Sequence, residues 1–198
     1  MCFLDDILIY GFSLAAHVEH LHTILHCLAT NQLLVKLSKC HFCLSKIDYL
    51  GHVVSTEVVK ADPSKMDAMI SWPQPTILKH LRGFLGLTGY YRRFIRHYTM
   101  IDALLTDLLK KDAFNSGAAT TSAFETLKAS MTTTLLLYLI DFSKPFEVET
   151  DASGTGIGAV LLHDGHPIAF FSKMIFSKLQ HSSAYNRERY ALAEAILK

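Results

Sequence analysis

Residues 3–10 read Phe-Leu-Asp-Asp-Ile-Leu-Ile-Tyr, and this stretch decides the fold because two adjacent carboxylates interrupt apolar, strand-forming residues. The pattern predicts a tight β-hairpin with Asp5 and Asp6 at its tip. Uncompensated buried charge is unfavourable, so a Mg²⁺ partner is one explanation, and two-metal phosphoryl transfer needs carboxylates held on rigid backbone. An ordinary turn is the other explanation, because Asp favours turns, and these residues alone leave the two even.

The composition limits the class of protein. The chain has 198 residues, half of them hydrophobic, which is enough for one medium domain or two small ones with real cores. A formal net charge of +1 means that any nucleic-acid surface must come from local clustering of Lys and Arg. Four cysteines form no disulfide framework and favour a reduced intracellular setting. No apolar stretch is long enough to span a bilayer, so no membrane partner is expected.

Periodicity and turn signals predict an α+β chain. Ser13 is expected to cap the first helix, Pro63 to open the second and Thr76 to cap a long third one. Asp164-Gly165 is a hairpin signal between two of the later strands. The expected helices are residues 14–28, 63–70, 77–91 with a continuation near 94–98, 101–110, 122–131 and 185–198, and the expected strands are 33–36, 47–55, 58–60, 146–151, 157–162 and 167–172.

Basic residues and glycines share one side of the long helix, in TILKHLRGFLGLTGYYRRF at residues 76–94. At about 100° per residue, and if the helix continues to Arg93, an arc of about 80° contains Lys79, Arg82, Gly86, Gly89 and Arg93. Glycine inside a helix costs about 1 kcal/mol relative to Ala, so two on a cationic stripe favour the close approach of a nucleic-acid strand. Close helix–helix packing beside a solvated basic edge is the alternative. The residues that we assign to this surface are Lys79, Arg82, Gly86, Gly89, Arg92 and Arg93.

A second set of carboxylates lies in the last third of the chain. Asp151 ends an apolar strand just before Ala-Ser-Gly, and Glu188 lies in the final helix. Taken alone, Glu188 is best interpreted as a solvated helix charge that pairs with Lys or Arg. Glu147 and Glu149 are expected to face solvent from the strand, and Glu194 to be exposed surface.

Several motifs together resemble gypsy-type LTR retrotransposon polyproteins in both order and spacing, and the resemblance covers nearly the whole chain. It implies an α+β fold with the C-terminal part of a reverse transcriptase palm at 1–61, a helical thumb-like section at 62–112 and a truncated RNase H-like α/β domain at 113–198. The motifs are FLDDILIY, HVEHLHTILHCL, KLSKCHFC, YLGHVVS, KADPSKMDAMISWPQP, LRGFLGLTGYYRRFI, LLKKDAF, FSKPFEVETDASGTGIGAVL, GHPIAFFSK and SAYNRERYALAEAI.

The resemblance implies an RNA-directed DNA polymerase with RNase H activity, which uses Mg²⁺ on an RNA–DNA hybrid or duplex. It makes Asp5 a catalytic Mg²⁺ ligand of the palm with Asp6 as its close neighbour, and Asp151 and Glu188 the first two ligands of the RNase H-like site. The basic stripe then belongs to a thumb that holds the duplex, and no small-molecule substrate beyond nucleotides is expected. Because the family's other carboxylates fall outside residues 1–198, we expect this chain alone to be inactive.

Two further features bear on the alternatives. Cys40-His41-Phe42-Cys43 has the spacing of half a zinc site, whereas the resemblance places a similar Lys-Cys-x-Phe in the palm without metal. The family usually has glycine with positive φ where this chain has Val58, which predicts strain there. Such departures, also found at Ser116, Leu135 and Ile140, favour a copy no longer under selection. The alternatives are therefore a catalytically dead nucleic-acid-binding module and a non-functional relic.

Overall fold

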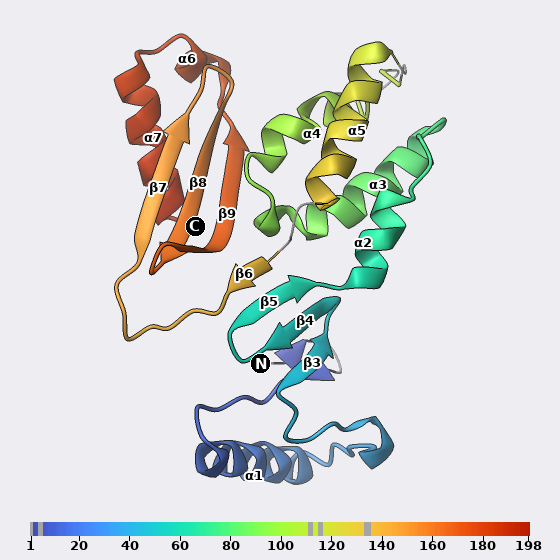
Figure 1. The fold of residues 1–198 in the computed structure, drawn as a ribbon, viewed down its shortest axis with the longest axis vertical. Helices are drawn as coiled ribbons and strands as arrows, with labels where there is room; N and C mark the ends of the chain where they lie inside the picture. Colours follow the sequence, from blue (N-terminus) through green and yellow to red (C-terminus); the bar gives the residue numbers. More distant parts are fainter. Residues whose placement is uncertain (1, 4–5, 111–112, 115–116, 133–135) are drawn as a thin grey trace.

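The computed structural model describes residues 2–3, 6–110, 113–114, 117–132 and 136–198, and it is a mixed α/β fold in which helices lie between and beside small antiparallel sheets (Figure 1). The elements in chain order are β1 (Cys2–Phe3), β2 (Asp6–Ile7), α1 (Leu14–Thr30), the 3-10 helix η1 (Leu37–Lys39), β3 (Lys46–Tyr49), β4 (His52–Ser55), β5 (Val58–Ala61), α2 (Pro63–Ile70), α3 (Leu78–Tyr90), the 3-10 helix η2 (Arg92–Phe94), α4 (Tyr98–Asp107), α5 (Ala118–Thr132), β6 (Leu136–Tyr138), β7 (Glu147–Ala152), β8 (Gly156–His163), β9 (His166–Met174), α6 (Ser177–Gln180) and α7 (Ala184–Ile196).

The N-terminal segment contains the two paired strands of the predicted hairpin, while Asp5 of its predicted tip lies outside the described residues. β1 pairs with β2 antiparallel, and Phe3 lies opposite Asp6, so Asp6 is the first residue of β2. The Ser13 side chain caps α1 by accepting the amide of Ala16, which confirms the predicted cap. The strand predicted at 33–36 is wrong. Those residues pair with no described strand, and the fully exposed side chain of Leu34 shows that no sheet face covers them.

β3, β4, β5 and β6 form a four-stranded antiparallel sheet in that order. The single strand predicted at 47–55 is in fact a hairpin, because Leu50 and Gly51 both have positive φ and reverse the chain. The strain predicted at Val58 is wrong as well. Val58 begins β5 without a positive φ, and its amide donates to Ser55 Oγ. β6 was not predicted, and it adds to the edge of β5 with Val58 opposite Tyr138.

The helical section follows this sheet. Asp62 caps α2 by accepting the amide of Ser64, and the helix covers the predicted residues 63–70. α3 is shorter than predicted: Ile77, not Thr76, is its N-cap, and the chain leaves the helix at Tyr91 to enter η2. Tyr91 is buried, and its hydroxyl donates to the carbonyl of Gly51. The predicted stripe assumed one continuous helix, but α3 ends before Arg93.

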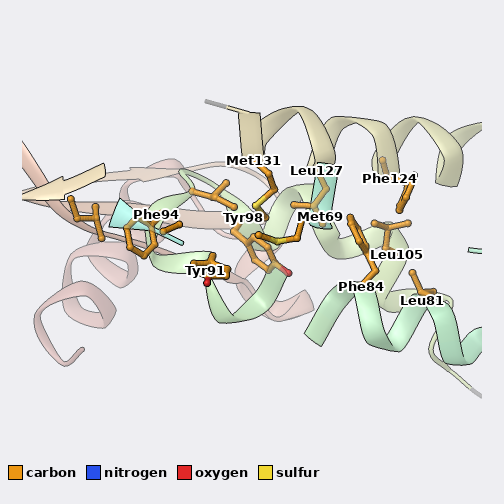
Figure 2. Close-up of a cluster of buried hydrophobic side chains, with 14 residues drawn as sticks. Met69, Leu81, Phe84, Tyr91, Phe94, Tyr98, Leu105, Phe124, Leu127 and Met131 are labelled. Carbon is orange, nitrogen blue, oxygen red and sulfur yellow. The ribbon is translucent and has the colours of Figure 1, made fainter. Parts of the chain in front are cut away.

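The main hydrophobic core joins α2, α3, α4 and α5 to the edge of the four-stranded sheet (Figure 2). Phe84 of α3 and Phe124 of α5 are buried with their ring centroids 4.6 Å apart, and Met69, Leu127 and Met131 complete the contact. α5 begins at Ala118, four residues before the predicted start, because its first turn is joined to Gly117 by hydrogen bonds. Thus α5 packs into the helical core, although the boundaries predicted at 61/62 and 112/113 stay predictions.

The third sheet has the order β7-β8-β9 and is antiparallel throughout, as predicted for the strands near 146–172. Asp164 and Gly165 both have positive φ, which confirms the hairpin turn. One face of this sheet packs on α7 through Ile157 and Ala191. The other face meets the helical section, where Phe170 packs against the main core. The sheet therefore lies between α7 and the helical section.

Candidate nucleic-acid interface and carboxylate sites

The exposed edge of α3 carries the predicted basic stripe. Lys79 and Arg82 are exposed, as expected from the helical wheel, while Leu81 and Phe84 are buried on the opposite side. A side chain at Gly86 would meet no atom within 4 Å, so packing within the described part of the chain does not require glycine there. The alternative of close helix packing thus fails at Gly86.

The glycine of α3 that is required by close packing is Gly83, which was not among the predicted residues. A Cβ atom at Gly83 would lie 3.2 Å from the Trp72 ring, whereas one at Gly89 would lie at an ordinary 3.5 Å from the Tyr98 hydroxyl. Trp72, in the turn before α3, could have indicated that a glycine of the helix packs closely on a large ring. Only the fold shows that this glycine is Gly83.

Arg92 and Arg93 are exposed in η2, beyond the end of α3. The charge of Arg92 also influences the carboxyl group of Asp102, a partly buried residue of α4. Burial raises the pKa of the Asp102 carboxyl to about 6, while its hydrogen bond from Thr106 and the charge of Arg92 lower it. The corner between α3 and α4 therefore combines exposed arginines with one partly desolvated carboxylate.

Only one of the two predicted palm carboxylates lies in the described part of the chain. Asp6 is exposed at the start of β2, and Asp5 lies outside the described residues. Their role as a metal-binding pair stays a prediction. Farther along, the Cys40 thiol donates to the carbonyl of Lys36 and Cys43 is exposed, and both are free thiols.

Asp151 lies on the sheet face that is turned toward the helical section. It pairs with Gly158, and side chains of paired strand residues share a face. A hollow of about 380 Å³ opens on this face, and it is lined by Arg96 and His97, by residues 149–151 of β7 and by residues 158–160 of β8. Glu149 is exposed, as predicted, but it borders this hollow and not open surface alone. Carboxylates of the sheet and the Arg96 residue of the helical section therefore border the same open hollow.

Glu188 is exposed in the second turn of α7, on the layer that covers the other face of the sheet. Ala152, next to Asp151, packs toward α7, so the Asp151 side chain points to the opposite face by strand alternation. In the ranges that the structure describes, no group of three or more His, Cys, Asp or Glu is arranged to hold a metal ion. The described residues thus do not assemble a magnesium centre, and a joint role for Asp151 and Glu188 stays a prediction.

Sequence reasoning missed His97. It adopts a left-handed conformation with φ of 56°, and its ring lies where a Cβ atom at Gly158 would come within 2.7 Å of Nδ1. That nitrogen is buried and has no hydrogen-bond partner among the described residues. Because Gly158 is more than 60 residues away in the chain, no local pattern could reveal this contact.

Comparison with known proteins places the chain in a family. The family model described as reverse transcriptase (RNA-dependent DNA polymerase) matches residues 1–54, and the RNase H-like domain found in reverse transcriptase matches residues 117–198. The chain is 39% identical over 197 residues to the retrovirus-related Pol polyprotein from transposon 297 of Drosophila melanogaster, across 98% of this chain and 19% of that protein. This chain belongs to the retrotransposon Pol polyprotein family. The gypsy transposon polyprotein of the same organism is 34% identical across 98% of the chain and 20% of its own length.

These matches confirm the resemblance to gypsy-type polyproteins. The chain spans about a fifth of the length of the curated polyproteins that it matches. It is also 44% identical over 131 residues to the uncharacterized mitochondrial protein AtMg00860 of Arabidopsis thaliana, across 65% of this chain and 83% of that protein. Reverse transcriptase and RNase H-like families generally use divalent metals.

The fold of this Pol chain matches a solved structure titled the foamy viral protease-reverse transcriptase in complex with RNA/DNA hybrid. The TM-score is 0.80 with 18% identity, across 95% of this chain and 26% of that one. The same enzyme in complex with dsDNA gives a TM-score of 0.79 with 19% identity, across 94% and 40% of the two chains. The α+β fold expected from the sequence is therefore confirmed. Within the described part of the chain, none of the helices combines the length and apolar character that a membrane crossing requires.

Proposed function

We propose that the helical section of this Pol chain holds a nucleic-acid duplex along the exposed edge of α3, as part of a reverse transcriptase with RNase H activity. One observation carries the proposal: Gly86 is open to solvent beside the exposed Arg82, with no atom of the described protein near its missing side chain. An open glycine lets a phosphate backbone approach the helix, and the neighbouring cations attract it.

Such a surface positions a duplex without reading its sequence, because Lys and Arg contacts to phosphates carry no base information. Lys79, Arg82, Arg92 and Arg93 supply the positive charge, and all four are exposed. The foamy viral protease-reverse transcriptase of similar fold forms complexes with RNA/DNA hybrid and with dsDNA, which supports the same two ligands for this chain.

The sharpest test is Gly86→Ala, because folding and binding are expected to change in opposite directions. Alanine fits the open space and stabilises the helix by about 1 kcal/mol. A methyl group on the binding edge is expected to weaken the affinity for an RNA–DNA hybrid, measured by fluorescence anisotropy. A more stable variant with unchanged affinity would rule out close approach at this glycine.

Charge variants give an independent test on the same hybrid. Each of Lys79→Gln and Arg82→Gln is expected to reduce the slope of log affinity against log salt by about 0.9, the value for one lost phosphate contact. Arg189→Gln is the matched control, since Arg189 is exposed on α7, on the far side of the third sheet. Equal slopes for all three variants and the parent would contradict duplex binding at α3.

A second candidate function is Mg²⁺-dependent phosphodiester chemistry, with Asp5 and Asp6 as palm carboxylates and Asp151 and Glu188 as RNase H-like carboxylates. The two family matches support it. Among the described residues, no three or more His, Cys, Asp or Glu side chains converge on a metal site.

Cleavage and extension assays separate this function from the alternatives. We expect the isolated chain to bind a hybrid without cleaving its RNA strand or extending a primer. Mg²⁺-dependent cleavage that is lost in Asp151→Asn, or extension lost in Asp5→Asn, would overturn the expected inactivity. Binding without either reaction supports a nucleic-acid-binding module, and a chain that neither binds nor reacts is a relic.

A further inference from the structure

The hollow beside Asp151 is built from two parts of the chain that are far apart in sequence. Arg96 and His97 come from the turn between η2 and α4, whereas Glu149 and Asp151 come from β7. Figure 1 shows the start of α4 beside β9, which belongs to the same sheet as β7. The hollow has a volume of about 380 Å³ and is partly open to solvent.

The position of Arg96 on the sheet is fixed by its neighbours. The His97 ring occupies the space left by the absent side chain of Gly158. Two residues farther on, the Thr99 amide donates to Ser172 Oγ at 2.9 Å. The backbone of Arg96 is therefore anchored to β8 and β9, although the residue belongs to the helical section.

The Arg96 guanidinium itself remains available for a ligand. It is exposed, and it forms no salt bridge with any described residue, including Glu149 and Asp151 in the same hollow. A guanidinium presents donors in a fixed fork that matches the oxygens of a phosphate. Along the chain, the exposed Arg92 and Arg93 lie between α3 and Arg96, so basic residues continue from α3 to the hollow.

We propose that Arg96 is a strand-positioning residue, whose guanidinium binds a backbone phosphate of the nucleic acid where the strand passes the hollow lined by Asp151. This inference rests on the proposed duplex binding at α3, and it names the residue that brings the strand from the helical section to the sheet. The competing role for Arg96 is purely internal, namely to offset the charges of Glu149 and Asp151.

Binding of an RNA–DNA hybrid by the full chain, followed by anisotropy over a series of salt concentrations, tests the proposal. Arg96→Gln is expected to reduce the salt slope by about 0.9, with an unchanged melting temperature because the side chain is exposed. Arg96→Lys keeps the charge and is expected to restore the slope, though not all of the affinity, since the fork is lost. Arg189→Gln serves again as the control.

A double-variant experiment separates direct contact from internal neutralisation. In a Glu149→Gln/Asp151→Asn background, a direct phosphate contact predicts that Arg96→Gln still weakens binding. Internal neutralisation predicts that the effect vanishes there, and that result would overturn the proposal. Loss of slope in Lys79→Gln and Arg82→Gln but not in Arg96→Gln would also overturn it while leaving duplex binding intact. No loss in any of the three variants would contradict the proposed function itself.

Discussion

Thr99 and Ser172 exchange three hydrogen bonds across the contact between α4 and β9. The Thr99 amide donates to Ser172 Oγ at 2.9 Å, Thr99 Oγ1 donates to the Ser172 carbonyl at 3.0 Å, and Ser172 Oγ donates to Thr99 Oγ1 at 3.0 Å. Both residues are half-buried. Directional bonds between parts 73 residues apart fix the orientation of the sheet on the helical section.

Ser172→Ala is expected to destabilise the chain by about 1–2 kcal/mol, because the Thr99 amide and hydroxyl both lose a partner in a half-buried place. Urea denaturation measures the loss, and hydrogen exchange at the Thr99 amide locates it. Ser177→Ala, at an exposed position at the start of α6, is the control. Equal stability of the two variants would show that these bonds contribute little.

Three glycines of the TDASGTGIG segment are expected to differ in their tolerance of alanine. A Cβ at Gly158 would lie 2.7 Å from Nδ1 of the His97 ring, while one at Gly156 would meet the flexible end of Met100 at the same distance. Gly154 has open space. Overpacking typically costs about 1–3 kcal/mol, so the loss of melting temperature is expected to be largest for Gly158→Ala, intermediate for Gly156→Ala and absent for Gly154→Ala. A different order would mean that the α4 corner does not press on the sheet.

The stability of the chain is expected to depend on pH through Asp102. Burial raises the pKa of this carboxyl in the folded state to about 6, above its ordinary 3.8. The folded state therefore holds the proton more tightly, and stability falls as pH rises from about 4 to about 6. After allowance for solvent screening of a partly exposed group, Asp102→Asn is expected to stabilise by about 1 kcal/mol at pH 7 and by nothing below pH 4.

Denaturation of Asp102→Asn at several pH values checks this expectation. Asp107→Asn is the control on the same helix, since Asp107 is exposed and pairs with Lys110 at 2.7 Å. A stabilisation by Asp102→Asn that is equal at pH 4 and pH 7 would show that the carboxylate is not desolvated.

Leu127 and Leu104 form a matched pair for the core. Leu127 of α5 is fully buried, whereas Leu104 of α4 is 49% exposed. Truncation of a buried leucine leaves a cavity and typically costs about 2–5 kcal/mol, so Leu127→Ala is expected to lose that much in thermal or chemical denaturation. Leu104→Ala is expected to lose less than 1 kcal/mol, on the order of a surface change. Similar losses would place the core elsewhere.

Features set by local chemistry were predicted well. The cap at Ser13, the helix after Asp62-Pro63 and the hairpin turn at Asp164-Gly165 each depend on residues within one turn of the chain, so composition and spacing were enough. The exposure of Lys79 and Arg82 followed in the same way from helical periodicity.

Features set by distant contacts were not predicted. The hairpin at Leu50-Gly51 is held by the hydroxyls of Tyr90 and Tyr91, which donate to the carbonyls of Leu50 and Gly51 from 40 residues away. Tyr91, which makes one of these two hydrogen bonds, is also the residue at which α3 ends. The place of Arg96 beside Asp151 likewise depends on how the α4 corner docks on β8, which no sequence window contains.

The return of β6 to the edge of β5 has a practical consequence for anyone who wishes to study the RNase H-like half by itself. A segment that begins at residue 113 would include α5, whose Phe124 and Leu127 pack in the helical core. It would also include β6, which pairs with the edge of β5. A division after Tyr138 leaves both with their partners. Of these two divisions, the one after Tyr138 therefore keeps α5 in the helical core and β6 paired with β5.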